Sequence, residues 1–241
     1  MRTIENHIEI APALQDIKEI LVWLKKERDS DILGQGFFNN KDIIMDSFRL
    51  GNAIVFKHEN KSIGLIVWNE SDDILVNIDI FVIDPSFRGK GLGRLFYHEV
   101  CNYFVEKGFK AVKLFCEPKT SEKFWIKMGL LKLHDCGYTE HELTYYGVLI
   151  DVASTIHMNN AEKIELWDVE PYEAMETEPR WTWYIENDEG RLLYPILHPC
   201  NCNWNLRWSR NGDVLKEGKI KYFTNEEFEL FKSKFLYIEK L

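Results

Sequence analysis

The segment at residues 83–94, "IDPSFRGKGLGR", decides how the rest of the chain is interpreted. Three glycines alternate within it with basic and apolar residues, in the order Arg88, Gly89, Lys90, Gly91, Leu92, Gly93 and Arg94. An apolar, strand-like run precedes the segment and a helical pattern follows it. A helix N-terminus carries unpaired N–H groups and a partial positive charge, which stabilise a bound anion. Glycines bring such N–H groups close to a ligand without Cβ clashes. The segment therefore predicts a phosphate-binding loop. The alternative is a basic turn that caps a structural helix.

The spacing of the glycines excludes two common phosphate-binding loops. The Walker pattern GxxxxGK[ST] is absent, because no Lys-Ser or Lys-Thr pair follows the last glycine. The dinucleotide pattern GxGxxG also fails, because the spacing here is GxGxG and no acidic partner of a βαβ unit follows. Coenzyme A, whose pyrophosphate has the same needs, remains as a ligand of this loop.

The patterns on both sides of the loop predict one α/β domain. Helical spacing is found at residues 13–29, 41–51, 92–107 and 119–129. Strand-like runs are found at residues 4–10, 110–117, 130–135 and 142–150, and three more lie between residues 52 and 85. The turns "HENK" and "NESDD" separate these three. This order predicts a mixed, mostly antiparallel sheet flanked by helices over roughly residues 1–150.

The loop and its surroundings resemble the acyl-CoA signature of the GNAT superfamily of N-acetyltransferases. The core pattern of that family, [QR]xxGx[GA], is matched by Arg88, Gly91 and Gly93. Downstream, "SEKFWIKMGL" at residues 121–130 resembles the family's "A..FYeklGF" segment, at the expected distance. The order of the strands agrees as well. The resemblance covers about residues 1–150 and implies a catalytic domain at residues 1–152 that uses acetyl-CoA as co-substrate and needs no metal.

The resemblance also implies which residues hold the co-substrate. Backbone N–H groups of the loop would bind the pyrophosphate, and the strand residues 81–83 would run beside the pantetheine arm. A bulge would splay this strand away from the strand at residues 111–116. Trp125 would pack against the arm or the core. The implied cofactor-binding residues are Phe81, Val82, Ile83, Arg88, Gly89, Lys90, Gly91, Leu92, Gly93, Arg94 and Trp125.

The family often uses a carboxylate on its fourth strand as general base, so the resemblance implies this role for Asp79, the one acidic residue within "ILVNIDIFVI". We expect Asp79 on the same strand face as Asn77 and Phe81. An acid inside an apolar strand is costly unless it is paired or functional, and burial would raise its pKa. The alternative is an Asp that faces solvent on a half-exposed strand.

The general acid is less determined by the sequence. The family commonly has a tyrosine where this chain has Trp125, and an indole N–H does not serve as a proton donor to a thiolate. The hydroxyl groups that could donate a proton to the thiolate are those of Ser121, Tyr138, Tyr145 and Tyr146. Ser121 and Tyr145 are the candidate catalytic residues among them. Water or the protonated product amine could also supply the proton. A Cys116 acyl-enzyme is a further alternative, but direct transfer is favoured because nothing nearby in sequence activates this thiol.

A polar stretch at residues 151–163 separates this domain from an accessory domain at residues 160–241. In the accessory domain we predict hairpins at residues 180–197 and 203–223, which turn at 188–190 and 211–212. We predict a closing helix at residues 224–241, with a capping box at its start. Four tryptophans are expected to pack in its core: Trp181, Trp183, Trp204 and Trp208. This small α+β domain could serve substrate selection, homodimer formation or regulation.

Composition narrows the class of protein further. The 241 residues carry a formal net charge of −9, which argues against nucleic-acid binding. No apolar run is long enough to span a membrane and the N-terminus lacks a signal-peptide pattern, so no membrane association is expected. Five cysteines without framework spacing predict reduced thiols and a cytoplasmic protein. "HPCNCNW" at residues 198–204 has poor spacing for zinc, so no metal site is predicted there.

These observations predict a cytoplasmic N-acetyltransferase that moves an acetyl group from acetyl-CoA to a primary amine by direct attack. The acceptor could be a small molecule or a protein or peptide amine. A first alternative is a CoA-binding sensor or scaffold with little turnover, which the missing tyrosine favours. A second alternative is that the accessory domain is a protein-interaction module and carries the main role.

Overall fold

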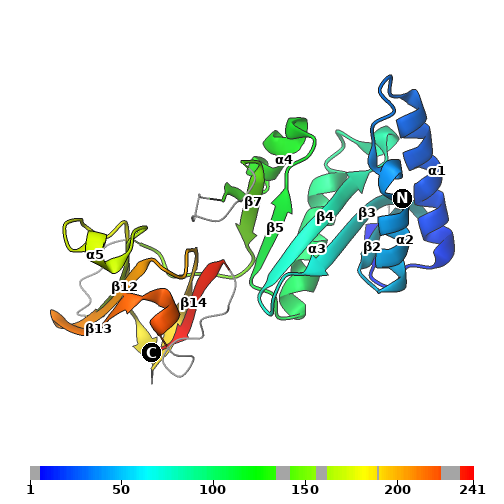
Figure 1. The fold of residues 1–241 in the computed structure, drawn as a ribbon. Helices are drawn as coiled ribbons and strands as arrows, with labels where there is room; N and C mark the ends of the chain where they lie inside the picture. The colour runs from blue at the N-terminus through cyan, green and yellow to red at the C-terminus, as the bar shows by residue number, and fades with distance from the viewer. Residues whose placement is uncertain (1–5, 134–141, 156–161, 189, 224–233) are drawn as a thin grey trace. The chain divides into compact units, whose positions relative to one another are not determined.

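The structure is a computed structural model that describes residues 6–133, 142–155, 162–188, 190–223 and 234–241 (Figure 1). The chain divides into two compact units, and each is described by itself. Unit 1 comprises Met1–Leu131 and Tyr145–Leu149, and unit 2 comprises Lys132–Thr144 and Ile150–Leu241. The domain limits predicted from the sequence, 1–152 and 160–241, stay a prediction.

A seven-stranded sheet with the order β1-β2-β3-β4-β5-β7-β6 forms the frame for unit 1. Its strands are β1 Asn6–Glu9, β2 Ala53–His58, β3 Lys61–Glu70, β4 Leu75–Ile83, β5 Ala111–Phe115, β6 Leu131–Lys132 and β7 Thr144–Val148. Strands β1 to β4 form an antiparallel meander, whereas β4 and β5 run parallel. A parallel neighbour requires a crossover, which contains helix α3 (Leu92–Glu106). The predicted fold class, a mixed and mostly antiparallel sheet flanked by helices, is confirmed.

Two helices cover one face of this sheet, α1 (Leu14–Ser30) and α2 (Lys41–Arg49), with the short 3₁₀ turn η1 (Phe37–Asn40) between them. The Asp16 carboxylate caps the start of α1, where it accepts a hydrogen bond from the Ala13 N–H at 2.9 Å. The buried stripe of the two helices meets the sheet in one apolar cluster, made of Ile17, Ile20, Leu24, Ile44, Ala53, Val55, Leu65, Val67, Ile80 and Val82.

Aromatic side chains fill the opposite face, under α3 and α4 (Glu122–Lys127), the latter preceded by the 3₁₀ turn η3 (Lys119–Ser121). Phe96 of α3 stacks between Phe56 and Phe81, at centroid distances of 5.0 and 5.4 Å. Trp68 meets Phe104 of α3 edge to face. The aromatic layer packs the start of α3 against the end of β4. The 3₁₀ turn η2 (Pro85–Phe87) and the glycine loop connect these two elements.

Strand β4 has a bulge at Asp79, and the bulge corrects one prediction about its faces. Val67 pairs with Ile80, but the next residue of β3, Trp68, pairs with Ile78, so Asp79 is the extra residue. Asn77 therefore lies on the face opposite Trp68 and α3, whereas Phe81 packs against Phe96 of α3. The prediction that Asn77, Asp79 and Phe81 share one face was wrong, because the extra residue shifts the alternation of side chains by one.

The described residues of unit 2 form two smaller sheets and the short helix α5 (Pro171–Ala174). One sheet has the order β13-β12-β8-β9 and the other β10-β11-β14. Their strands are β8 Glu162–Leu166, β9 Trp181–Tyr184, β10 Asn187–Asp188, β11 Arg191–Pro199, β12 Asn205–Arg210, β13 Asp213–Lys219 and β14 Phe235–Lys240, with the 3₁₀ turn η4 (Ile220–Tyr222) before the last. Trp183 and Trp204 belong to the apolar core of this unit, and Trp181 and Trp208 pack against it, as predicted.

Two of the predictions for unit 2 need correction. The hairpin at residues 203–223 is present as β12 and β13, but residues 180–197 do not form one hairpin. Strand β9 pairs with β8, and β11 pairs with β10 and β14 in the other sheet. The helix predicted at residues 224–241 is wrong for Phe235–Lys240, which form strand β14, while residues 224–233 lie outside the described part of the chain. The run "FLYIEK" is rich in β-branched and aromatic residues, which favour a strand.

Candidate functional site

A cavity of about 1150 Å³ opens where β4 and β5 separate in unit 1. The parallel pairing of the two strands ends at Ile78 and Leu114, although β4 continues to Ile83. Beyond that point both strands line the cavity, β4 with Phe81, Val82 and Ile83 and β5 with Leu114 and Phe115. The divergence leaves the edge of β4 without a strand on its β5 side, so a slot with backbone donors and acceptors lies open to a ligand.

The glycine loop, residues 88–94, forms one end of this cavity, with Arg88, Gly89, Gly91, Gly93 and Arg94 among its lining residues. Gly89 and Gly91 have φ values of 76° and 81°, which a side chain would strain. Gly91 is the N-cap of α3, a helix of 15 residues. In the described structure, the N–H groups of residues 89–93 donate to no backbone acceptor. This run of free donors and the helix dipole together suit a phosphate.

The basic side chains of the loop are used in different ways. Arg88 donates from Nε to the Ile83 carbonyl at 2.7 Å and forms an ion pair with Glu27 of α1 at 2.7 Å. Lys90 donates to the Ser86 carbonyl at 3.0 Å and does not line the cavity. Arg94 is exposed, lines the cavity and has no ion-pair partner among the described residues. Arg88 and Lys90 therefore hold the loop, and Arg94 is free to meet an anion.

Trp125 lies in the wall of the cavity and is buried, at the position where a tyrosine was expected from the family pattern. Its ring meets Phe81 at 5.1 Å, Phe124 at 4.9 Å and Tyr97 at 5.6 Å between centroids, in each case edge to face. The indole is therefore part of both the aromatic layer and the apolar wall of the cavity. It has no acidic group that could protonate a thiolate.

Asp79 also lines the cavity, at the bulge where β4 begins to diverge from β5. Its carboxylate accepts a hydrogen bond from Asn69 Nδ2 at 2.6 Å. The side chain reaches solvent, but the surrounding protein displaces part of the water around the carboxylate. This burial raises the pKa of Asp79 above its ordinary value of 3.8, against the opposing effect of the Asn69 hydrogen bond.

Ser121 lines the cavity at the start of α4. Its hydroxyl donates to the Pro118 carbonyl at 2.9 Å and lies 3.3 Å from the Cys116 thiol. Cys116 itself is fully buried and is not among the residues that line the cavity. The serine hydroxyl is therefore within the site but has its proton engaged with a backbone carbonyl.

Tyr145 is not brought to this cavity. It is buried in β7 and donates its phenolic proton to the Glu122 carboxylate. This hydrogen bond is the main cause that raises the pKa of Tyr145, to about 12. Tyr146 is also buried and outside the lining, and Tyr138 lies outside the described residues. The structure thus brings together Asp79, Ser121 and the glycine loop, and it leaves Tyr145 apart.

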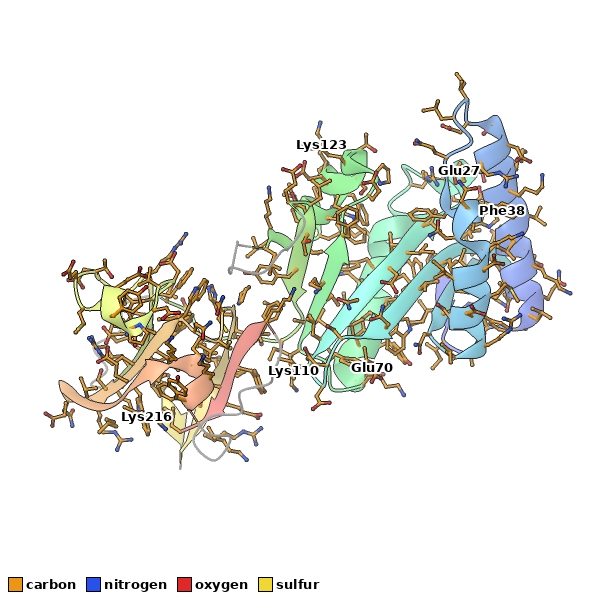
Figure 2. The ribbon with its side chains drawn as sticks, viewed as in Figure 1. Glu27, Phe38, Glu70, Lys110, Lys123 and Lys216 are labelled. Carbon is orange, nitrogen blue, oxygen red and sulfur yellow. The ribbon has the colours of Figure 1, made fainter. Side chains whose placement is uncertain are left out.

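Residues near α1 complete the cavity, and the sequence did not identify them. Glu27 lies in the last turn of α1 and Asp31 directly follows this helix. The segment that leads into α2 adds Gln35, Gly36, Phe37, Asn39 and Asn40. Figure 2 shows Glu27 near the same end of the sheet as Lys123 of α4, and Glu70 and Lys110 near the other end. The one local signal was the pair of glycines in "GQG" at residues 34–36, which marks a special turn but not what the turn faces.

The "HPCNCNW" segment offers no metal centre in the described part of the chain. Cys200 is buried and Cys202 is exposed, and the His198 ring packs against Trp181 and Trp183. Within the described residues, no group of three or more His, Cys, Asp or Glu side chains is placed to hold a metal ion. No helix among those residues is long and apolar enough to cross a membrane.

Comparisons with known proteins find one family model and several similar solved structures. Residues 15–130 match the model of the acetyltransferase (GNAT) family. Similar solved structures include Ard1 from Thermoplasma volcanium, which is 16% identical with a TM-score of 0.48, over 61% of this chain and 99% of that one. The GNAT family N-acetyltransferase YhbS from Escherichia coli, in complex with CoA, is 17% identical with a TM-score of 0.47, over 61% and 82%.

A third similar structure is the PaiA N-acetyltransferase from Thermoplasma acidophilum in complex with coenzyme A. It is 13% identical with a TM-score of 0.48, over 60% of this chain and 99% of that one. No curated protein sequence matches the chain.

Proposed function

This chain carries a domain of the acetyltransferase (GNAT) family, and from this premise we propose that it transfers an acetyl group from acetyl-CoA to a primary amine. The observation that carries the proposal is the cavity between β4 and β5, closed at one end by the glycine loop. An elongated thioester with a phosphate-bearing end matches a slot that has backbone donors and a helix N-terminus at its end.

The residues present fit coenzyme A at three points. The free N–H groups of residues 89–93 and the exposed Arg94 would hold the pyrophosphate. A Cβ atom at Gly91 would meet no protein atom within 4 Å, so the space above the loop is open to a ligand. The free edge of β4 at residues 81–83 would pair with the amides of the pantetheine arm, and Trp125 would pack beside it.

Asp79 would act as the general base for the acceptor amine. A protonated amine has no lone pair, so its proton must leave before the nitrogen attacks the thioester carbon. The carboxylate lies at the bulge, where the two strands open, and its raised pKa makes it a better proton acceptor than an ordinary Asp. The new C–N bond forms as the C–S bond breaks, and the products are the acetylated amine and CoA.

The departing thiolate needs no strong acid from the protein. Among the described residues that line the cavity there is no tyrosine, cysteine or histidine, and the hydroxyls are those of Thr120 and Ser121. A thiolate is a good leaving group, so water or the proton of the product amine would complete the reaction. We include Ser121 as a group that could orient that water.

The same observation favours a second candidate function, a CoA-binding sensor or scaffold with little turnover. The described lining residues include no tyrosine, cysteine or histidine, and a cavity whose transfer reaction required such an acid would bind CoA without turnover. Both candidate functions require binding of the co-substrate. The acetyltransferase should release the CoA thiol when an amine is added, whereas the sensor should not.

The deciding experiment is calorimetric titration of the full chain with acetyl-CoA and CoA, followed by a thiol-release assay with a panel of amines. Micromolar binding and release with at least one amine support the acetyltransferase. Binding without release for every amine supports the sensor. If neither ligand binds, both candidate functions are wrong, and the loop is a basic turn that caps a structural helix.

A further inference from the structure

The Asp79 carboxylate is held by a neighbouring amide that the reaction described above does not use. Asn69, on β3, donates from Nδ2 to Asp79 Oδ2 at 2.6 Å. A hydrogen bond of this length to an ionised carboxylate is of the strong, charge-assisted type. The donor comes from the adjacent strand, so the bond fixes the bulged residue relative to the rest of the sheet.

A second amide fixes the orientation of the first. Asn77 of β4 is the direct cross-strand partner of Asn69, and its Nδ2 donates to Asn69 Oδ1 at 3.1 Å. With its oxygen held by Asn77, the Asn69 amide can present only its NH₂ group to Asp79. A flipped amide would place an oxygen against the carboxylate and face NH₂ with NH₂. The chain Asn77 to Asn69 to Asp79 is therefore directional.

The bulge makes this chain geometrically possible. As the extra residue of β4, Asp79 has no cross-strand partner on β3, and the face shift brings its carboxylate to the Asn69 side. At the end of the chain, Asn77 Oδ1 is buried and has no hydrogen-bond partner in the described structure. A buried acceptor without a donor lowers stability. The arrangement is thus less stable than a strand pair in which every buried polar group is paired. Such local losses of stability are typical of functional sites.

We propose that Asn69 is a positioning residue for Asp79, with its amide, oriented by Asn77, holding the carboxylate at the mouth of the slot between β4 and β5. The proposal rests on the proposed function, in which Asp79 is the base. Without Asn69, the carboxylate could rotate away from the acceptor amine, and its ionised form would lose its one hydrogen-bond donor among the described residues.

A pH profile is a suitable readout because few other groups affect Asp79. Glu70 follows Asn69 on β3, and Lys113 on β5 is the cross-strand partner of Asn77. The cavity is lined by further charged groups, Glu27, Asp31, Arg88, Arg94, Glu117 and Lys127. Burial raises the pKa of Asp79, and the Asn69 hydrogen bond opposes this rise. A change in its titration therefore reports on the Asn69 hydrogen bond.

The test uses the full chain with acetyl-CoA and an amine that the wild type acetylates. Asn69→Val keeps a residue that suits a strand and removes the donor. We expect kcat to fall roughly tenfold, as for a hydrogen bond to a charged group. We expect the acidic limb of the pH profile of kcat/KM to move to higher pH, because the lost donor stabilised the ionised form of Asp79. The Kd for acetyl-CoA should not change. Asn69→Gln, which restores an amide, should recover part of the rate.

Glu70→Gln is the matched control, since it removes a charge from the neighbouring exposed position of the same strand (Figure 2). It should leave kcat and the acidic limb unchanged. If Asn69→Val lowers expression or stability, Asn69→Ser is the second variant, with acetyl-CoA binding as its test of folding. Asn77→Val should shift the limb in the same direction, by less.

The outcomes separate this inference from the proposed function. If Asn69→Val and Asn69→Ser keep the wild-type acidic limb while Asp79→Asn removes it, the positioning role is wrong and the base assignment stands. A loss of rate with an unchanged limb also overturns the positioning role, because it indicates a structural effect. If Asp79→Asn itself keeps the limb, the base assignment fails, and the role of Asn69 fails with it.

Discussion

Arg88 and Glu27 form an ion pair, with 2.7 Å between Arg88 Nη1 and Glu27 Oε1, that joins the glycine loop to the last turns of α1. The same guanidinium donates to the Ile83 carbonyl at the end of β4. Arg88 therefore links a helix on one face of the sheet, the end of β4 and the loop before α3. Its side chain therefore fixes the shape of the loop, and in the proposed function the backbone and Arg94 would bind the anion.

This ion pair predicts that Glu27→Gln weakens coenzyme A binding although Glu27 is acidic. Removing a carboxylate near a phosphate site would by charge alone strengthen binding, so the sign of the effect is informative. The pair is partly exposed and is worth about 0.5–1 kcal/mol, so we expect a rise in Kd of roughly twofold to fivefold. Calorimetry of the variant measures it. Glu19→Gln, on the exposed side of the same helix, is the control.

A tighter complex with Glu27→Gln would contradict the role of Arg88 in holding the loop. It would indicate instead that Glu27 acts on the bound anion by repulsion.

The glycine loop predicts that Gly91→Glu abolishes coenzyme A binding while the fold is kept. Gly91 has a φ of 81°, so any side chain there costs about 1 kcal/mol of strain, and a carboxylate would also repel the phosphates. Gly108→Glu is a matched control, because Gly108 has a φ of 99° at the far end of α3 and an equally open Cβ position. Both variants should lose similar stability in thermal unfolding, and only Gly91→Glu should lose binding.

Equal loss of binding in the two glycine variants would mean that strain in α3 is the cause. Unchanged binding in Gly91→Glu would show that the loop does not hold the phosphates.

Asp79→Asn should lower kcat by roughly 10²-fold, with little effect on the Kd for acetyl-CoA. A base acts only when ionised, so wild-type activity should fall as the pH drops through a pKa that burial raises above 3.8. The same shift means that the folded state holds the Asp79 proton more tightly than the unfolded chain. Ionised Asp79 therefore lowers stability at neutral pH, and Asp79→Asn should unfold at higher temperature there and lose this advantage in acid.

Equal kcat in wild type and Asp79→Asn would remove Asp79 as the base. A loss of activity combined with a loss of stability at neutral pH would indicate that the carboxylate has a structural role.

The features that the sequence predicts best are those with local causes. Gly89 and Gly91 mark the loop because only glycine adopts their φ values at low cost, and the run that follows has helical periodicity. The strands β2, β3 and β4 are separated by turns that contain Asn, Asp and Ser. Such signals lie within a few residues of the element that they predict, so a single sequence contains them.

The features that were missed depend on distant partners. The bulge at Asp79 is visible only in the register of β4 against β3, and it moved Asn77 and Phe81 to opposite faces. Strand β9 was assigned to β11 because a turn lies between them, but it pairs with β8 across the α5 segment. Asn69 looked like a turn residue in "NESDD", and its contact with Asp79 follows from strand pairing that the sequence does not contain.

Tyr145 and Glu122 give a prediction about stability in alkali. The phenol donates to the carboxylate, and this hydrogen bond raises the pKa of Tyr145 from an ordinary 10.0 to about 12. Between these two values the unfolded chain releases the proton and the folded chain keeps it, so the wild type should lose stability as the pH rises from 10.0 to 12. Tyr145→Phe lacks this group and should show a shallower loss over the same interval.

Below pH 10 the variant should be less stable than the wild type by about 1.5–3 kcal/mol, the net value of one hydrogen bond to a charged group. Urea unfolding at several pH values measures both effects. Glu122→Gln tests the partner, and the double variant should cost less than the sum of the two single ones, because each removes the same bond. Parallel pH profiles for wild type and Tyr145→Phe would contradict the assignment. They would mean that the Tyr145 proton is held no more tightly in the fold than in the unfolded chain.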